Sequence, residues 1–191
     1  EVESKGGVIN AFTAEEITCF WNKLPKKHFA LGADISRDLV TNPIFENNAL
    51  ERERRVVLEE IKMYHDNPQR HVFDQIESNL YDKPFGEKII GSEKTVSNLS
   101  RDFVASYFKE RYSPENYIVT VVGNADLNKI CEYFEKNFSS EKDLNLKSLE
   151  IKKINKETSE ERPGIDQAHF IFAVHAPMAK NRNYQVLEVL D

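Results

Sequence analysis

The longest periodic segment of this 191-residue chain runs from about residue 46 to residue 66 and predicts a single helix. At about 100° per residue, this helix places four large side chains on one apolar stripe, namely Leu50, Val57, Ile61 and Tyr64. Asn67-Pro68 ends the segment, because a residue that precedes proline disfavours the helical conformation. The fold must therefore include a long helix with one covered face.

Other strand and helix patterns surround this helix. Residues 8–23 are rich in β-branched and aromatic side chains and predict two strands or one bent strand. The apolar run at residues 117–122 predicts a strand buried on both faces, and residues 167–175 predict another strand. Amphipathic patterns predict helices at about residues 26–40, 70–80, 101–111 and 126–137, with Ser100 as an N-cap. Together these elements predict an α+β fold, with a two-layer mixed sheet and packed helices.

The chain is predicted to contain more than one structural part. Residues 1–140 carry most of the strands and helices and are expected to form an N-terminal domain. That domain is expected to lack its first part, because the opening residues resemble the end of a helix stopped by Gly6. Residues 141–163 are charged and contain no aromatic side chain, which is typical of a linker. Residues 164–191 are then the start of a second domain.

Composition and charge argue against two classes of partner. The net charge of -6 and the isoelectric point near 5.5 do not suit a nucleic-acid-binding protein, which usually presents a basic face. No apolar run reaches the ~20 residues that a membrane-spanning helix needs. The two cysteines, Cys19 and Cys131, are far apart and lack the spacing of a zinc finger. Neither nucleic acid nor a membrane is therefore expected as a partner.

Two carboxylates lie on the apolar side of the predicted 46–66 helix. Glu53 and Glu60 are seven residues apart, which is two helical turns, and share the side of Val57 and Tyr64. A carboxylate that faces a core is costly unless it is paired or binds a cation. Each glutamate could pair with a buried arginine or a helix N-terminus. Alternatively, one could bind a metal while the other orients a ligand or accepts a proton, and the spacing alone does not separate these interpretations.

A second candidate site begins where the first strand follows a double glycine. Gly6-Gly7 precede the stretch Val8-Ile9-Asn10-Ala11-Phe12-Thr13. A small residue such as Ala11 lets another backbone approach closely, and an open edge strand can bind an extended peptide through main-chain hydrogen bonds. The simpler interpretation is an ordinary sheet strand with a tight entry turn.

Four segments, taken in chain order, carry a family resemblance. They are residues 6–13, residues 51–64, the loop that contains Pro84-Phe85-Gly86 and Ile90-Gly91-Ser92, and residues 112–124. Together they resemble the pitrilysin/insulinase family of zinc metallopeptidases, closest to its mitochondrial-processing-peptidase-like bacterial type. The stretch at residues 167–172 resembles the opening strand of that family's second, related domain. The resemblance implies that residues 1–140 are an incomplete peptidase N-terminal domain.

The resemblance implies roles for the candidate residues. In this family, two histidines of a His-x-x-Glu-His helix and a downstream glutamate hold a catalytic zinc, and another glutamate lies seven residues before that ligand. Glu60 matches the zinc ligand, and Glu53 matches the second carboxylate, which acts from outside the ligand set. Asn10, Ala11, Phe12 and Thr13 match the edge strand that pairs with an extended peptide substrate. The implied activity is cleavage of peptides or unfolded polypeptides by a zinc-activated water.

The histidine half of such a site is not found in these residues. None of the five histidines belongs to a His-x-x-Glu-His motif, and His65 and His71, six residues apart across Asn67-Pro68, are not expected to share a helix face. We therefore expect Zn²⁺ in an intact parent protein and no catalytic zinc or activity in this piece alone.

The parent's protein partner would be the second half of its own chain or a homologous subunit. The alternative function is that of a non-catalytic, structural or substrate-presenting subunit of the same family. The presence of both Glu53 and Glu60 favours the peptidase, because a non-catalytic subunit has no metal-related need for them.

Overall fold

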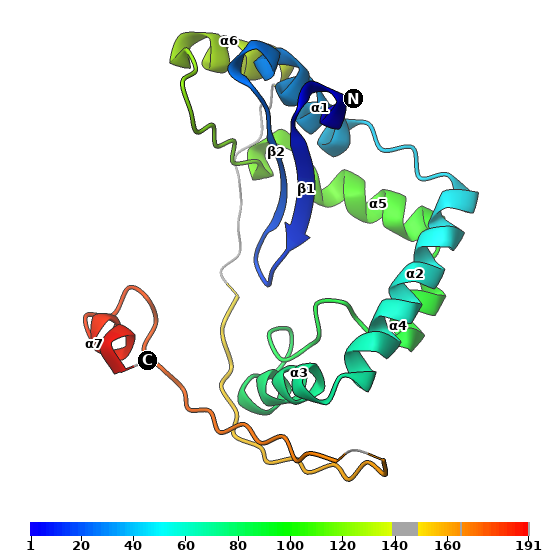
Figure 1. The fold of residues 1–191 in the computed structure, drawn as a ribbon, viewed down its shortest axis with the longest axis vertical. Helices are drawn as coiled ribbons and strands as arrows, with labels where there is room; N and C mark the ends of the chain where they lie inside the picture. Colours follow the sequence, from blue (N-terminus) through cyan, green and yellow to red (C-terminus); the bar gives the residue numbers. More distant parts are fainter. Residues whose placement is uncertain (139–148, 165, 191) are drawn as a thin grey trace. The chain divides into compact units, whose positions relative to one another are not determined.

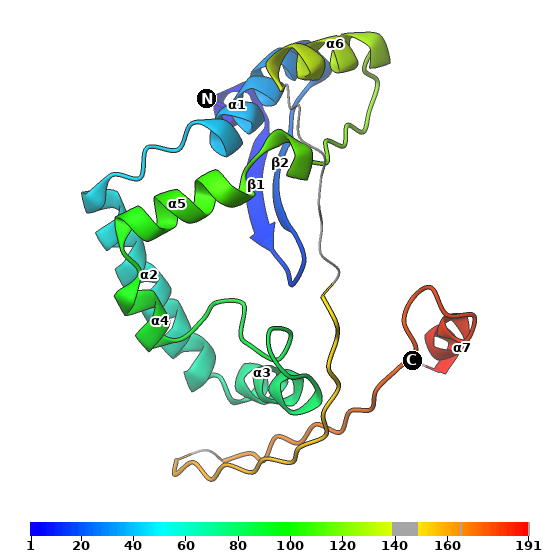
Figure 2. The same ribbon diagram turned by 180° about the vertical axis from the view of Figure 1, so that it is seen from behind.

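The computed structural model describes residues 1–138, 149–164 and 166–190, and it confirms the predicted α+β class (Figures 1 and 2). The strands are β1 (Val8–Thr13) and β2 (Thr18–Lys23). The α-helices are α1 (Phe29–Thr41), α2 (Asn47–Asp66), α3 (Pro68–Leu80), α4 (Glu93–Asn98), α5 (Arg101–Arg111), α6 (Leu127–Asn137) and α7 (Tyr184–Leu190). Short 3-10 helices are η1 (Glu3–Lys5), η2 (Lys26–His28) and η3 (Pro114–Asn116).

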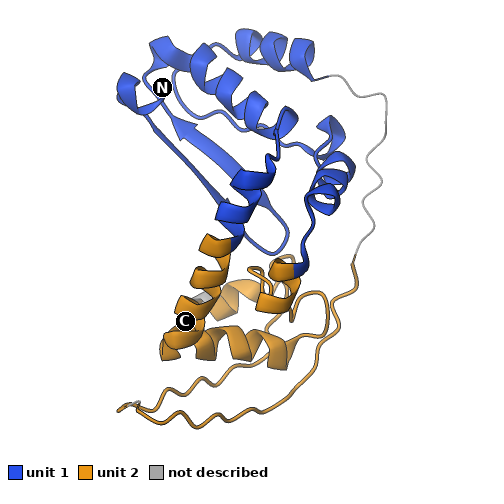
Figure 3. Ribbon diagram, turned by 90° about the vertical axis from the view of Figure 1, so that its right-hand side faces the viewer, with its two compact units in different colours: residues 1–54, 98–148 blue, residues 55–97, 149–191 orange. Residues whose placement is uncertain are grey.

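The chain forms two compact units, which Figure 3 distinguishes by colour. The first unit comprises residues 1–54 and 98–148, and the second comprises residues 55–97 and 149–191. Helix α2 is continuous across the boundary, so each unit contains one part of it. No helix in the described part of the chain is long and apolar enough to cross a membrane.

The first unit contains an antiparallel hairpin. β1 and β2 pair in the register Val8↔Lys23 to Thr13↔Thr18, so residues 8–23 form two strands and not one bent strand. Gly6 ends η1 with a left-handed φ of 72°, which favours glycine, and a Cβ on Gly7 would lie 2.8 Å from the carbonyl oxygen of Lys23. The double glycine therefore fixes the entry of the chain into β1.

The helices of the first unit are attached by specific polar contacts. The Asn22 side chain on β2 donates to the carbonyl of Gly32 in α1 at 3.0 Å, and the Tyr133 hydroxyl on α6 donates to Asp34 of α1 at 3.3 Å. At the start of α5, the Ser100 hydroxyl accepts from the Phe103 amide at 3.1 Å, as the predicted N-cap requires. The predicted helices at 26–40, 101–111 and 126–137 are thus observed within a few residues.

The predicted strand at residues 117–122 is not part of a sheet in the described chain. Ile118 and Val122 are 91% and 93% exposed, so the prediction of a strand buried on both faces is wrong for this structure. An apolar run becomes a buried strand only when neighbours pair with its backbone and cover its faces. The only sheet among the described residues is the β1–β2 hairpin, so this segment and residues 167–175 remain unpaired as strands.

In the second unit, α2 passes into α3 through a tight turn at Asn67. The Asn67 side chain accepts from the Arg70 amide at 3.0 Å, and Pro68 occupies the first turn of α3, where its missing N–H is not needed. Helix α3 therefore begins at Pro68 and not near residue 70 as predicted. Helix α4 lies between α3 and α5 and was not predicted.

The backbone of residues 152–156 pairs with the end of α3. Three hydrogen bonds join the two segments, from the Ile154 amide to Leu80 O (2.8 Å), from the Lys156 amide to Asn79 O (3.0 Å) and from the Asp82 amide to Lys152 O (2.9 Å). Farther on, His175 Nε2 lies 2.9 Å from the Ile154 carbonyl oxygen, so residues 154–164 and 166–175 run side by side (Figures 1 and 2). Part of the predicted linker is thus held against a helix.

The Glu160 carboxylate forms a second set of contacts that hold the segment beginning at residue 152. Glu160 accepts a hydrogen bond from Arg162 Nε and lies 2.9 Å from Nε2 of the buried His71. Arg162 also donates to the backbone carbonyl of His65. The hydrogen bond from Arg162 and, after it, the contact with His71 lower the pKa of Glu160 to about 2.

We expect the contacts of Glu160 with Arg162 and His71 to weaken below pH 4.5 and to be lost near pH 2. The folded pKa of Glu160, about 2, lies below the ordinary 4.5, so the released segment binds the proton more readily than the fastened one. The stabilisation is therefore complete above 4.5 and disappears as the pH falls through about 2. Hydrogen-exchange protection of the Ile154 and Lys156 amides should follow this course.

The matched variants for this prediction are Glu160→Gln and Glu157→Gln. Glu157 is exposed, so its replacement should leave the protection of the 154 and 156 amides unchanged at neutral pH. Glu160→Gln should reduce that protection because it removes the charge that pairs with Arg162. Equal protection in the two variants would contradict the role of Glu160.

Candidate functional site

Glu60 is a half-buried carboxylate of α2 with one oxygen held in place. The Tyr64 hydroxyl, one turn later, donates to Glu60 Oε1 at 2.6 Å, and Tyr64 is half-buried as well. Among the described residues, Oε2 has no hydrogen-bond partner. The hydrogen bond to Glu60, followed by burial, raises the pKa of Tyr64, because a phenolate would face the carboxylate. Glu60 therefore presents one free oxygen that could bind a cation.

Tyr64 is itself held by α3. The guanidinium carbon of Arg70 lies 4.9 Å from the centroid of the Tyr64 ring, within the range of a cation–π interaction. Arg70 Nε lies 3.7 Å from Asp74 Oδ1, and the other Asp74 oxygen lies 3.4 Å from Lys88 Nζ. The side chain of Asp74 is only 16% exposed. A chain of contacts thus runs from Glu60 through α3 to the following loop.

Glu53 lies two turns before Glu60 on the same helix but is exposed. The sequence predicted that Glu53 faces a core, and the structure differs because no element of the described chain covers it. The protected side chain is its neighbour Arg54, which is 14% exposed and donates to the Leu99 carbonyl at 2.6 Å. An exposed Glu53 carboxylate needs no buried partner. The role that the resemblance implies for Glu53 is therefore supported only by its place on α2, two turns before Glu60.

β1 offers an accessible strand edge. All six residues of β1 are exposed, including the predicted substrate-binding residues Asn10, Ala11, Phe12 and Thr13. β2 pairs with one edge of β1, and no other strand in the described chain pairs with the second edge. The Ala11 amide donates to Oδ1 of Asn10 at 2.7 Å, so the side chain of Asn10 occupies a main-chain donor of this strand. Asn10–Thr13 and Glu53 belong to the first unit, whereas Glu60 belongs to the second.

The described histidines do not complete a metal site. No group of three or more His, Cys, Asp or Glu side chains in the described ranges is arranged to hold a metal. His65 and His71 lie on different helices, as expected, yet the turn at Asn67 brings their ring centroids to 5.0 Å in an edge-on contact. Sequence spacing did not reveal this contact, because it depends on the angle at the turn. By its donor chemistry, Glu60 fits one zinc ligand, and the described residues do not supply the others.

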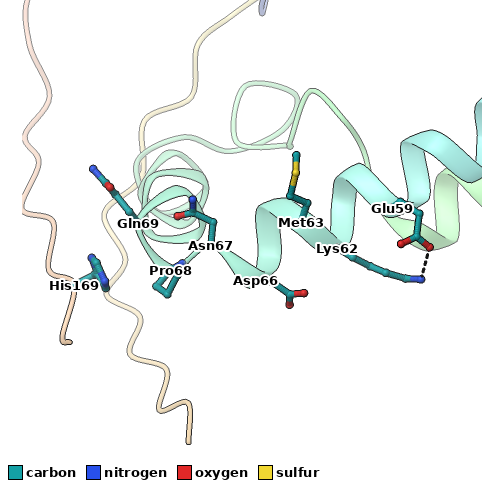
Figure 4. Close-up of a pocket in the computed structure, with 8 residues that line it drawn as sticks. All are labelled: Glu59, Lys62, Met63, Asp66, Asn67, Pro68, Gln69 and His169. Carbon is teal, nitrogen blue, oxygen red and sulfur yellow. Dashed lines mark hydrogen bonds and ion pairs between the residues drawn. The ribbon is translucent and has the colours of Figure 1, made fainter. Parts of the chain in front are cut away.

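A hollow of about 730 Å³ lies at the α2–α3 turn (Figure 4). It is lined by Glu59, Lys62, Met63, Asp66, Asn67, Pro68, Gln69 and His169. Figure 4 shows that Glu59 and Lys62 form an ion pair along its wall, at 2.9 Å. Neither Glu53 nor Glu60 lines this hollow, so it does not mark the candidate metal ligand.

Curated relatives of this chain are bacterial proteins that are named as zinc proteases. The zinc protease YmxG of Bacillus subtilis is 35% identical over 120 residues, which cover 62% of this chain and 29% of the relative. A zinc protease of Mycobacterium leprae is 35% identical over 140 residues, which cover 73% of this chain and 32% of the relative. This chain thus spans about a third of the length of the relatives that it matches.

Solved structures and family profiles agree with these relatives. A protease from Helicobacter pylori matches 80% of this chain and 38% of its own, with a TM-score of 0.68 and 26% identity. A peptidase M16 inactive domain from Pseudomonas fluorescens, 16% identical, matches 79% of this chain and 37% of its own with a TM-score of 0.64, which shows the fold. The family profile described as Insulinase (Peptidase family M16) matches residues 1–93, and that of the Peptidase M16 inactive domain matches residues 98–191. With both halves of its sequence matched, this chain belongs to the insulinase, or M16, family of peptidases.

Proposed function

We propose that residues 1–191 are part of a zinc-dependent metalloendopeptidase and provide the glutamate ligand of its metal. The observation that carries this proposal is the Glu60 carboxylate, which is half-buried, has Oε1 held by Tyr64 and leaves Oε2 free among the described residues. Carboxylate oxygens are common zinc ligands, and a catalytic site needs three protein ligands and one open position. The names of the bacterial zinc proteases support the same activity.

The other candidate residues are proposed to bind and orient. The free edge of β1 at Asn10–Thr13 would bind an extended peptide through main-chain hydrogen bonds. Because the Ala11 amide donates to the Asn10 side chain, a peptide that pairs with this amide would displace that side chain. Glu53, two turns before Glu60, would orient the metal site without ligating the metal.

The cofactor would be Zn²⁺, and its histidine ligands would come from residues outside these 191. When bound, zinc lowers the pKa of a coordinated water and polarises a carbonyl group. We also propose residues 1–140 as the peptidase N-terminal domain, 141–163 as a linker and 164–191 as the start of the related second domain. The second half of the parent chain or a homologous subunit would be the protein partner.

A second candidate function is a non-catalytic subunit of the same family. This alternative is supported by the match of residues 98–191 to a profile named for an inactive domain. The two functions differ in one feature of the longer protein, because only the peptidase needs a His-x-x-Glu-His helix to complete the zinc ligands.

The longer protein that carries these residues is expected to hydrolyse an unfolded polypeptide or an extended peptide in a zinc-dependent way. A chelator should abolish hydrolysis because the open zinc site is lost, and added zinc should restore it while added calcium should not. Peptide cleavage and zinc content, measured before and after dialysis, test this expectation. Hydrolysis that persists in metal-free protein, or a complete absence of zinc and activity, would contradict the peptidase function.

A further inference from the structure

We propose that Tyr64 is a positioning residue for the metal ligand Glu60. This inference rests on the proposed function, because it assigns a role to the neighbour of a proposed ligand. Its direct basis is the hydrogen bond of 2.6 Å that the Tyr64 hydroxyl donates to Glu60 Oε1. The two residues are four apart on α2, where helical geometry brings side chains together.

The hydrogen bond restricts a side chain that is otherwise flexible. A free glutamate loses rotamer entropy when it binds a metal, and that loss weakens binding. With Oε1 held by a phenol hydroxyl, the carboxylate is already oriented and Oε2 is the oxygen left for the metal. Ligating carboxylates in metal sites are commonly hydrogen-bonded in this way, and their partners affect metal affinity strongly.

The phenol is also suited to this role because it is anchored from a different helix. The Arg70 guanidinium lies over the Tyr64 ring at 4.9 Å, and Arg70 is held in turn by the poorly exposed Asp74. Glu59, one residue before Glu60, provides a contrast, since its side chain is 74% exposed and pairs with the flexible Lys62. Of these two adjacent carboxylates, only Glu60 is therefore preorganised.

The test compares Tyr64→Phe with Tyr107→Phe in the longer, zinc-loaded protein. Tyr107, on α5, also has an arginine near its ring, with the Arg111 guanidinium at 5.8 Å, but among the described residues its hydroxyl has no hydrogen-bond partner. Tyr64→Phe should weaken zinc binding about tenfold or more by chelator competition, as loss of an outer-shell partner does. It should lower kcat with little change in KM and leave the melting temperature of the metal-free protein unchanged.

The two remaining variants separate this inference from the proposed function. Arg70→Met should weaken zinc binding by a smaller factor, about two- to fivefold, because it removes only the cation over the ring. If Glu60→Gln abolishes zinc binding while Tyr64→Phe binds zinc like Tyr107→Phe, the positioning role is wrong and the proposed function stands. If Glu60→Gln retains wild-type zinc affinity, the proposed function itself is wrong.

Discussion

Glu60→Gln in the longer, zinc-binding protein is expected to lose more than about 100-fold in both zinc affinity and peptidase activity. The amide is neutral and a poor zinc ligand, whereas the Glu60 carboxylate has a free Oε2 and an oriented Oε1. Loss of a group that only supports a ligand already costs about 10–100-fold, so loss of the ligand should cost more. Chelator competition and hydrolysis of an extended peptide, measured on the same preparation, give the two quantities.

Two neighbouring glutamates on α2 provide the controls for this prediction. Glu53→Gln should keep most of the zinc while lowering turnover about tenfold, because it acts through orientation. Glu59→Gln should change neither quantity, since the Glu59–Lys62 pair is exposed and such pairs contribute little. Full zinc and full turnover in both the Glu60 and the Glu53 variants would show that both roles are assigned wrongly.

Residues 1–191 produced alone are expected to show no peptidase activity and no zinc bound tighter than about 1 µM, far weaker than zinc sites with a full ligand set. A single carboxylate lacks the nitrogen ligands of a catalytic site, and no group of three donors occurs in the described ranges. Equilibrium dialysis with zinc measures the affinity, and the isolated Glu60→Gln chain should bind zinc equally weakly. One tightly bound zinc per chain, lost in that variant, would contradict this expectation.

The parts of the fold that the sequence predicted well are those set by local interactions. Helix α2 spans Asn47–Asp66 where about 46–66 was predicted, because its apolar stripe and the following Asn67-Pro68 act within the segment itself. Ser100 caps α5 as predicted for the same reason. For residues 8–23 the sequence left two alternatives, two strands or one bent strand, and the structure forms the two-stranded β1–β2 hairpin.

The parts that the sequence did not predict depend on distant partners. Residues 117–122 have a strand composition, but no described segment pairs with them, and Val122 remains 93% exposed. The exposure of Glu53 likewise depends on what covers α2, which helical periodicity cannot show. The contact between His65 and His71 depends on the turn between two helices. In the candidate site, helical periodicity singled out Glu53 and Glu60 and the family resemblance supplied their roles, whereas the Tyr64–Glu60 hydrogen bond is seen only in the structure.

A crystal structure of the longer protein with zinc, located by anomalous diffraction at the zinc edge, would show directly whether Glu60 is a zinc ligand. The expected result is one zinc ion with a Glu60 oxygen at about 2.0–2.2 Å, two histidine nitrogens at about 2.0–2.1 Å and the Tyr64 hydroxyl on the other Glu60 oxygen. A zinc ion held by residues that do not include Glu60 would contradict it.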